Sequence, residues 1–118
     1  MSEEQERIDE IVVHAQYVMG LDRMEVVNRY HFRADEEAAC EHLSGDSQYH
    51  RAVLRWNVAH TPPLSDEEIR ATAVHELVHA MLGPLWDQIS EKEKERLDWF
   101  NEYATETVAR SILLLFPK

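Results

Sequence analysis

The stretch His75-Glu76-Leu77-Val78-His79 is the most informative part of this chain. It lies within an apolar repeat at positions 74, 77, 78 and 81, a spacing that is typical of the buried face of a helix. Residues four apart in a helix project from the same face, so the imidazoles of His75 and His79 can approach each other. At about 100° per residue, both histidines point away from the apolar stripe. Two histidines in this H-E-x-x-H arrangement can share one Zn²⁺, with Glu76 beside them.

The residues around the motif predict two long helices. Ser65 and Glu68 have the spacing of a capping box, which predicts a helix from about residue 66 to residue 82. Gly83-Pro84 is expected to end that helix. Ser90 and Glu93 repeat the capping pattern before a second long helix, which is predicted to run to about residue 115.

The first half of the chain predicts one helix followed by three strands. The helix is expected over residues 4–19, with Gly20 as its stop signal. Strands are expected over residues 23–32, 38–43 and 48–59, where β-branched and aromatic residues are frequent.

The pattern of the third strand and the order of elements predict the fold class. Apolar residues at 52, 54, 56 and 58 alternate with Arg51, Arg55 and Asn57, which predicts a sheet with one wet face. The expected fold is α+β, with a small, mostly antiparallel three-stranded sheet packed against the helices in the order α-β-β-β-α-α. At 118 residues, the whole chain, 1–118, is expected to form a single domain.

Composition and charge exclude several partners. The net charge of −11 argues against nucleic acid, because phosphate binding requires clustered Lys and Arg. No apolar run approaches the roughly 18 residues of a membrane span, and the acidic N-terminus has no apolar signal core. Cys40 is the one cysteine, so an internal disulfide is excluded and a cytoplasmic location is expected. Its expected role is that of a small buried hydrophobe.

A zinc ion held by two histidines requires a third protein ligand. Asp98, Glu102 and Glu106 are spaced four apart on the last predicted helix and therefore share one face. We favour Glu102 as the ligand, with Asp98 and Glu106 as alternatives. Glu106 is also placed to accept a hydrogen bond from the far nitrogen of a ligating histidine, which would fix the orientation of that ring.

The motif His75-Glu76-x-x-His79, followed by Glu102-x-x-x-Glu106 on a later helix, resembles the gluzincin branch of zinc metallopeptidases. The order of elements is similar to the reduced catalytic core called a minigluzincin, with zincin-type helices. Residues 102–113 also resemble the third-ligand helix of phage-type peptidases related to the ImmA and IrrE proteins. The resemblance covers about residues 48–115. Two features depart from it, because Glu106 stands where aspartate or asparagine is commoner and the second lobe of large gluzincins is missing.

The resemblance implies a zinc-dependent metallopeptidase that acts on peptides or proteins. Glu76 would be the general base, and His75, His79 and Glu102 would hold the metal. His60 is the favoured oxyanion donor, and other candidate donors are His31, Tyr49 and Tyr103. In zincins an edge strand beside the metal helix pairs with an extended substrate, and residues 48–59 resemble that strand.

Other interpretations of the motif remain open. The chain could be a binding or regulatory module that keeps the metal but turns over little substrate, or a structural domain with no metal. The same ligands also suit Mn²⁺, Co²⁺ or Ni²⁺. The oligomeric state is left open by the sequence.

Overall fold

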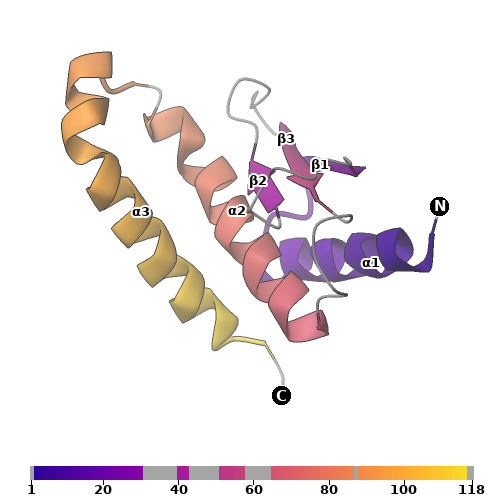
Figure 1. Ribbon diagram of the computed structural model, residues 1–118. Helices are drawn as coiled ribbons and strands as arrows, with labels where there is room; N and C mark the ends of the chain where they lie inside the picture. The colour runs from indigo at the N-terminus through magenta and orange to yellow at the C-terminus, as the bar shows by residue number, and fades with distance from the viewer. Residues whose placement is uncertain (1, 31–39, 43–50, 58–64, 87, 117–118) are drawn as a thin grey trace.

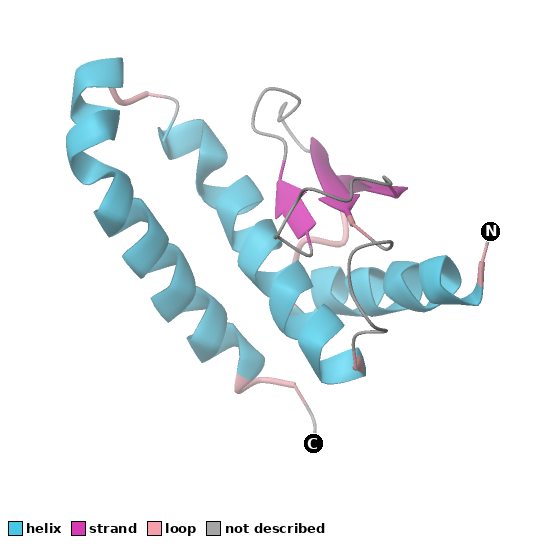
Figure 2. Cartoon of the chain, in the orientation of Figure 1, coloured by secondary structure: helices cyan, strands magenta, loops and turns pink. Residues whose placement is uncertain are grey.

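The computed structural model describes residues 2–30, 40–42, 51–57, 65–86 and 88–116, with the backbone alone described at 41, 42, 84 and 85. The structure is α+β, and its elements in chain order are α1 (Glu3–Val18), β1 (Glu25–Tyr30), β2 (Cys40–His42), β3 (Arg51–Trp56), α2 (Asp66–Trp86) and α3 (Glu91–Leu113). The helix α2 lies between the strands and α3, as Figure 1 shows. Figure 2 shows α2 and α3 side by side as an antiparallel hairpin.

The three described strands form one sheet in the order β1-β3-β2. The strands β1 and β3 pair in parallel from Glu25 opposite Arg51 to Tyr30 opposite Trp56. The short strand β2 pairs with β3 in the antiparallel sense on the other side. The prediction of a mostly antiparallel sheet is therefore wrong. Strand propensity and alternation specify which face of a strand is buried, but not the direction of its neighbour.

The strand β3 lies in the middle of this sheet, with partners on both sides. The prediction that residues 48–59 form an edge strand is therefore wrong. Its alternation is also incomplete, because Val53 and Asn57 are buried as well as Leu54 and Trp56. The predicted wet face is thus covered at Val53 of β3 and at Asn57, directly after it. Burial depends on what packs over each face of the sheet, and the strand sequence does not contain that information.

The helix α1 begins and ends at local signals in the sequence. The Ser2 hydroxyl accepts a hydrogen bond from the Gln5 backbone N–H at 3.2 Å, and the Gln5 side chain accepts one from the Ser2 backbone N–H. Gly20 has φ of +73°, a left-handed conformation that glycine adopts without steric cost. The predicted stop at Gly20 is confirmed.

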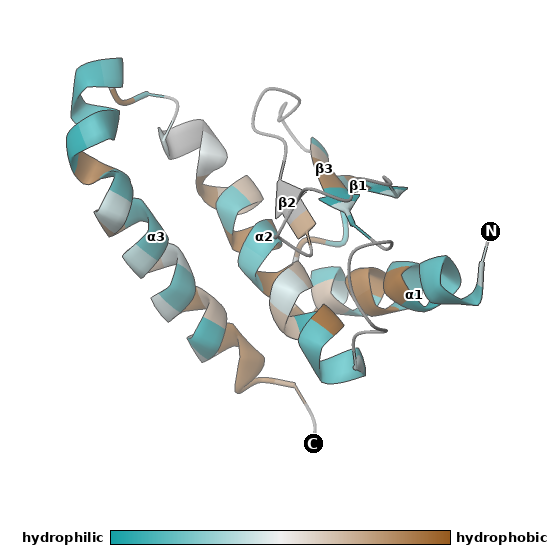
Figure 3. Ribbon diagram, viewed as in Figure 1, coloured by the Kyte–Doolittle hydropathy of each residue, from teal (hydrophilic) through white to brown (hydrophobic). Residues whose placement is uncertain are grey.

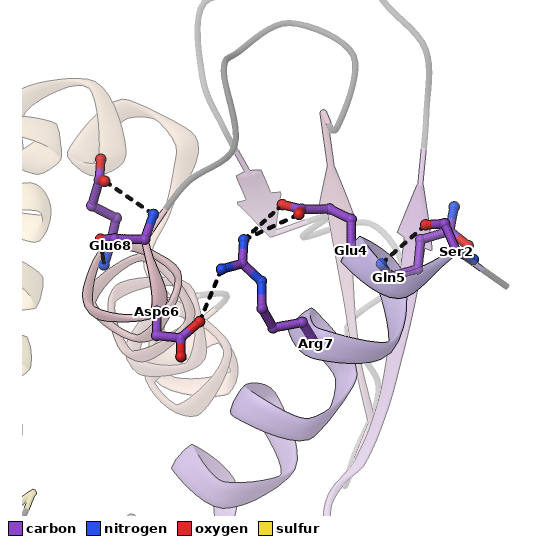
Figure 4. A network of polar contacts seen from close by, with 7 residues as sticks. Ser2, Glu4, Gln5, Arg7, Asp66 and Glu68 are labelled. Atoms are coloured by element: carbon purple, nitrogen blue, oxygen red, sulfur yellow. Dashed lines mark hydrogen bonds and ion pairs between the residues drawn. The ribbon is translucent and has the colours of Figure 1, made fainter.

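Polar contacts connect the start of α1 with the start of α2, as Figure 4 shows. The Arg7 guanidinium lies 3.0 Å from the Asp66 carboxylate and also contacts Glu4 on its own helix. The predicted capping box of α2 is present, since Ser65 and Glu68 each accept a backbone hydrogen bond from the other at 3.1 Å. These contacts set where α2 begins relative to α1.

The helix α2 does not end at Gly83-Pro84, contrary to the prediction, but continues to Trp86. Gly83 is not among the described glycines with positive φ, so it continues the helix here. The proline ring has a φ that suits a helix, and in the last turn it removes only one backbone hydrogen bond. After the turn, the Ser90 hydroxyl accepts a hydrogen bond from the Glu93 backbone N–H at 3.3 Å and begins α3.

The hydrophobic core lies where α1, α2 and the sheet meet. The helix α3 covers α2 from the other side and adds Ala109 to the core. Figure 3 shows α3 as mostly hydrophilic except toward its C-terminal end. The core residues that are essentially inaccessible to solvent include Ile8, Val12, Leu54, Trp56, Ile69, Leu77 and Val78. Within the described ranges, none of the helices combines the length and the hydropathy needed to cross a membrane.

Candidate metal centre

The two histidines of the motif lie on the side of α2 that faces α3. Val74, Leu77 and Val78 are fully buried on the opposite stripe of α2, which holds the helix in one rotation about its axis. The side chain of His75 is 24% exposed and that of His79 is 18% exposed. Their ring centroids are 4.9 Å apart. The spacing predicted from the sequence therefore brings both imidazoles together at the α2–α3 interface.

The helix α3 brings Glu102 to the same place. The His79 Nε2 atom lies 3.2 Å from one Glu102 carboxylate oxygen, and His75 Nε2 lies 3.7 Å from the other. One ligand atom from each of these three residues lies within 4.8 Å of the others. In the part of the chain that the structure describes, they form the one group of metal-ligating side chains with this geometry.

These distances suit a small tetrahedral cation. Two ligands that each lie about 2.0–2.1 Å from Zn²⁺ at a tetrahedral angle are about 3.4 Å apart. The separations of 3.2 and 3.7 Å between histidine nitrogens and Glu102 oxygens lie on either side of that value. Two imidazoles and one carboxylate also leave a fourth position for water, which is the pattern of catalytic zinc sites. The residues present therefore fit a zinc ion.

Glu106 orients His75. Its carboxylate lies 2.8 Å from His75 Nδ1, and because a carboxylate can only accept, Nδ1–H is the donor. In a neutral imidazole the lone pair then lies on Nε2, the nitrogen that faces Glu102. This hydrogen bond is the one predicted for Glu106, and it prepares His75 to bind a metal.

Arg110 supports Glu106 from one turn further along α3. Its Nε–H donates to the other Glu106 oxygen at 3.0 Å. The hydrogen bond from Arg110 lowers the pKa of Glu106 most, and the hydrogen bond with His75 lowers it further. Glu106 therefore stays ionised and available to His75. Arg110 was not among the residues predicted for the site, although its position four residues after Glu106 was a signal for this contact.

The environment of His79 favours its neutral form. Burial lowers the pKa of His79 most. The charge of Glu102 raises the pKa, His75 lowers it further, and Asp98 raises it slightly. The net effect is a lowered pKa, and a neutral imidazole is the form that binds metal.

Glu76 follows His75 on α2, and its charge acts on the sheet side of the helix. It is partly buried, and its negative charge acts on Cys40 at the start of β2. Burial first, and then Glu76, raise the pKa of the Cys40 thiol, which therefore stays protonated at neutral pH. Cys40 is buried in the core and is not part of the His75, His79 and Glu102 cluster, as the prediction of a small buried hydrophobe requires.

The remaining candidate ligands and donors lie outside this cluster or outside the described residues. Asp98 is exposed and lies outside the three-residue cluster, and Tyr103 is exposed on α3 next to Glu102. The predicted oxyanion donor His60 and the alternatives His31 and Tyr49 lie outside the described residues.

The chain was compared with protein families, curated proteins and solved structures. No family model, no curated protein and no solved structure matches the chain. The candidate metal centre is therefore the main evidence for function.

Proposed function

We propose that this protein is a zinc metallopeptidase of the gluzincin type, in which His75, His79 and Glu102 hold the metal and Glu76 is the general base. The observation that carries the proposal is the convergence of the three donors from α2 and α3, all within 4.8 Å of one another. A structural group of two histidines and a glutamate would not require the further hydrogen bond by which Glu106 directs the His75 lone pair inward.

When bound, a zinc ion would lower the pKa of a coordinated water toward about 7 and polarise the scissile carbonyl. The chain supplies the rest of the chemistry. His75, oriented by Glu106, and His79, kept neutral by burial, present their Nε2 atoms. Glu76 takes the proton of the attacking water and delivers it to the leaving amine.

A peptide or protein is the proposed substrate, and the cytoplasm is the proposed location. In the described sheet, β2 is the edge strand that packs against α2, so β2 replaces residues 48–59 as the strand beside which a substrate backbone would pair. The cytoplasm suits a chain whose one cysteine is buried and protonated.

Metal content tests the site directly. Wild type, Glu102→Ala and Asp98→Ala would be purified without a metal-affinity tag, supplemented with zinc, desalted and measured by elemental mass spectrometry. We expect about one zinc per chain in wild type and in Asp98→Ala, with little in Glu102→Ala. Absence of zinc from the wild type would overturn the proposal. Loss of zinc in Asp98→Ala, but not in Glu102→Ala, would show that Asp98 is the third ligand instead.

Peptide cleavage tests the reaction. Zinc-loaded wild type and Glu76→Gln would be incubated with a peptide library, and the products would be identified by mass spectrometry. Cleavage by wild type that is lost in Glu76→Gln, with equal zinc in both, is the expected result. Zinc binding without cleavage in either protein would instead favour the metal-retaining binding module.

A further inference from the structure

Two aromatic side chains on α3 are exposed to an unusual degree. Trp99 is 69% exposed and Tyr103 is 66% exposed, although such rings normally bury a large part of their surface. We call these two residues the aromatic patch. Exposed apolar surface of this kind is typical of sites that bind a partner or ligand.

The aromatic patch borders the candidate metal centre. Trp99 precedes Glu102 by three residues and Tyr103 by four, so these side chains are neighbours on the surface of α3. Glu102 itself contacts His79 at 3.2 Å. A peptide whose scissile bond lay at the metal could therefore place a neighbouring side chain on the patch.

The surroundings of the patch are negative. Glu95 and Asp98 are exposed one turn before Trp99 and Glu102, respectively, and the described residues provide neither with an ion-pair partner. Lys94 and Arg96, basic residues of the same helix close in sequence, are paired with Glu91 and Glu93. Among the described residues, the aromatic patch thus lies beside two carboxylates that form no ion pair.

We infer that the aromatic patch receives an arginine or lysine side chain of the peptide substrate, next to the bond that is cut. The cation would lie over the ring of Trp99, while Glu95 and Asp98 offset its charge. An acidic substrate residue would be repelled by these carboxylates and by the net charge of −11. An aliphatic residue could pack against the aromatic rings, but it would not be attracted by the carboxylates. This inference rests on the proposed peptidase function and names the substrate class.

The test compares peptides that differ only in charge. Acetylated, amidated alanine-based hexapeptides would carry either arginine or its neutral analogue citrulline at one position. Their binding to zinc-loaded Glu76→Gln would be measured by calorimetry, with no turnover. We expect the best arginine peptide to bind about five- to tenfold more tightly than its citrulline partner, with the ratio falling in high salt.

Substitutions test whether the preference for arginine depends on Trp99. In the Glu76→Gln background, Trp99→Ala should bring the arginine-to-citrulline ratio close to one, and Trp99→Phe should keep part of it. Tyr17→Ala removes an equally exposed aromatic side chain on α1 and should leave the ratio unchanged. Equal binding of the two peptides, no binding of either, or a ratio that survives Trp99→Ala would each overturn the inference.

The two proposals fail in different ways. Preference for arginine without zinc binding or cleavage would overturn the peptidase proposal and leave a site for basic peptides. Cleavage that ignores arginine, measured with the same peptides and zinc-loaded wild type, would overturn only the inferred substrate class.

Discussion

His75 has a different contact at each of its ring nitrogens. Nδ1 donates to Glu106 at 2.8 Å, and Nε2 faces Glu102 at 3.7 Å. A hydrogen bond on one nitrogen determines which tautomer is present, and therefore which nitrogen can bind a metal. Arg110 holds Glu106 in turn, so Glu106 and Arg110 together orient His75 with its Nε2 lone pair toward Glu102.

Removing Glu106 should weaken the metal site without removing a ligand. For Glu106→Ala we expect zinc affinity to fall by about 10- to 100-fold, because the His75 ring loses its orienting partner. The dissociation constant would be measured by competition with a chromophoric chelator. Glu67→Ala, which removes an exposed glutamate in the first turn of α2, is the matched control and should bind zinc like wild type. Unchanged affinity in Glu106→Ala would show that Glu106 does not prepare His75.

At this scale the sequence predicted which side chains share a helix turn. The spacing of four residues places His75 with His79, and Glu102 with Glu106, whatever the rest of the chain does. The same spacing also places Asp98 with Glu102, so the sequence favoured Glu102 but left Asp98 as an alternative. Only the packing of α3 against α2 determines that Glu102 lies opposite the histidines.

At the scale of elements, the predictions for helix starts were accurate because capping is a local interaction. The predicted Ser65–Glu68 box is present, and at the second predicted start the Ser90 hydroxyl accepts from the Glu93 backbone N–H. The Ser2–Gln5 box at the start of α1 was not predicted. The end of α2 was predicted wrongly, since Gly83-Pro84 permits a helical turn as well as a stop. The sheet was also predicted wrongly, since β1 and β3 come together only in the folded chain.

The two described glycines with known surroundings should respond oppositely to alanine. Gly83 lies inside α2, and a Cβ there would meet nothing within 4 Å, so Gly83→Ala should stabilise the fold by about 0.5–1 kcal/mol. Gly20 has φ of +73°, so Gly20→Ala should destabilise it by about 1 kcal/mol or more. Urea unfolding followed by circular dichroism would measure both free energies. A destabilised Gly83→Ala would contradict a continuous α2 through residue 83.

At the scale of the whole molecule, the candidate metal centre joins α3 to the rest of the fold. The helix α3 packs on α2 and contributes Ala109 to the core that α1, α2 and the sheet share. A metal bound by His75, His79 and Glu102 would therefore connect the two long helices across their interface.

Zinc should stabilise the folded protein. At a free concentration about 100 times the dissociation constant, a ligand that binds only the folded state adds about 2.7 kcal/mol to the free energy of unfolding. For a domain of this size, the midpoint of thermal unfolding should rise by roughly 10 °C. Scanning calorimetry with and without zinc would measure the shift, and addition of a chelator should reverse it. The double variant His75→Ala/His79→Ala should show no shift, and an equal shift in that variant would mean that zinc binds elsewhere.

The sequence by itself determined the faces and the beginnings of the helices, and the pairing of His75 with His79 on one of those faces. These features depend on bond geometry and on hydrogen bonds between residues a few positions apart, so they can be predicted locally. The tertiary structure alone decided the parallel pairing of β1 with β3, the contact of Glu102 with His79, and the exposure of Trp99. Each of these depends on which surfaces of distant segments pack together, and that is decided by the burial energy of the whole chain.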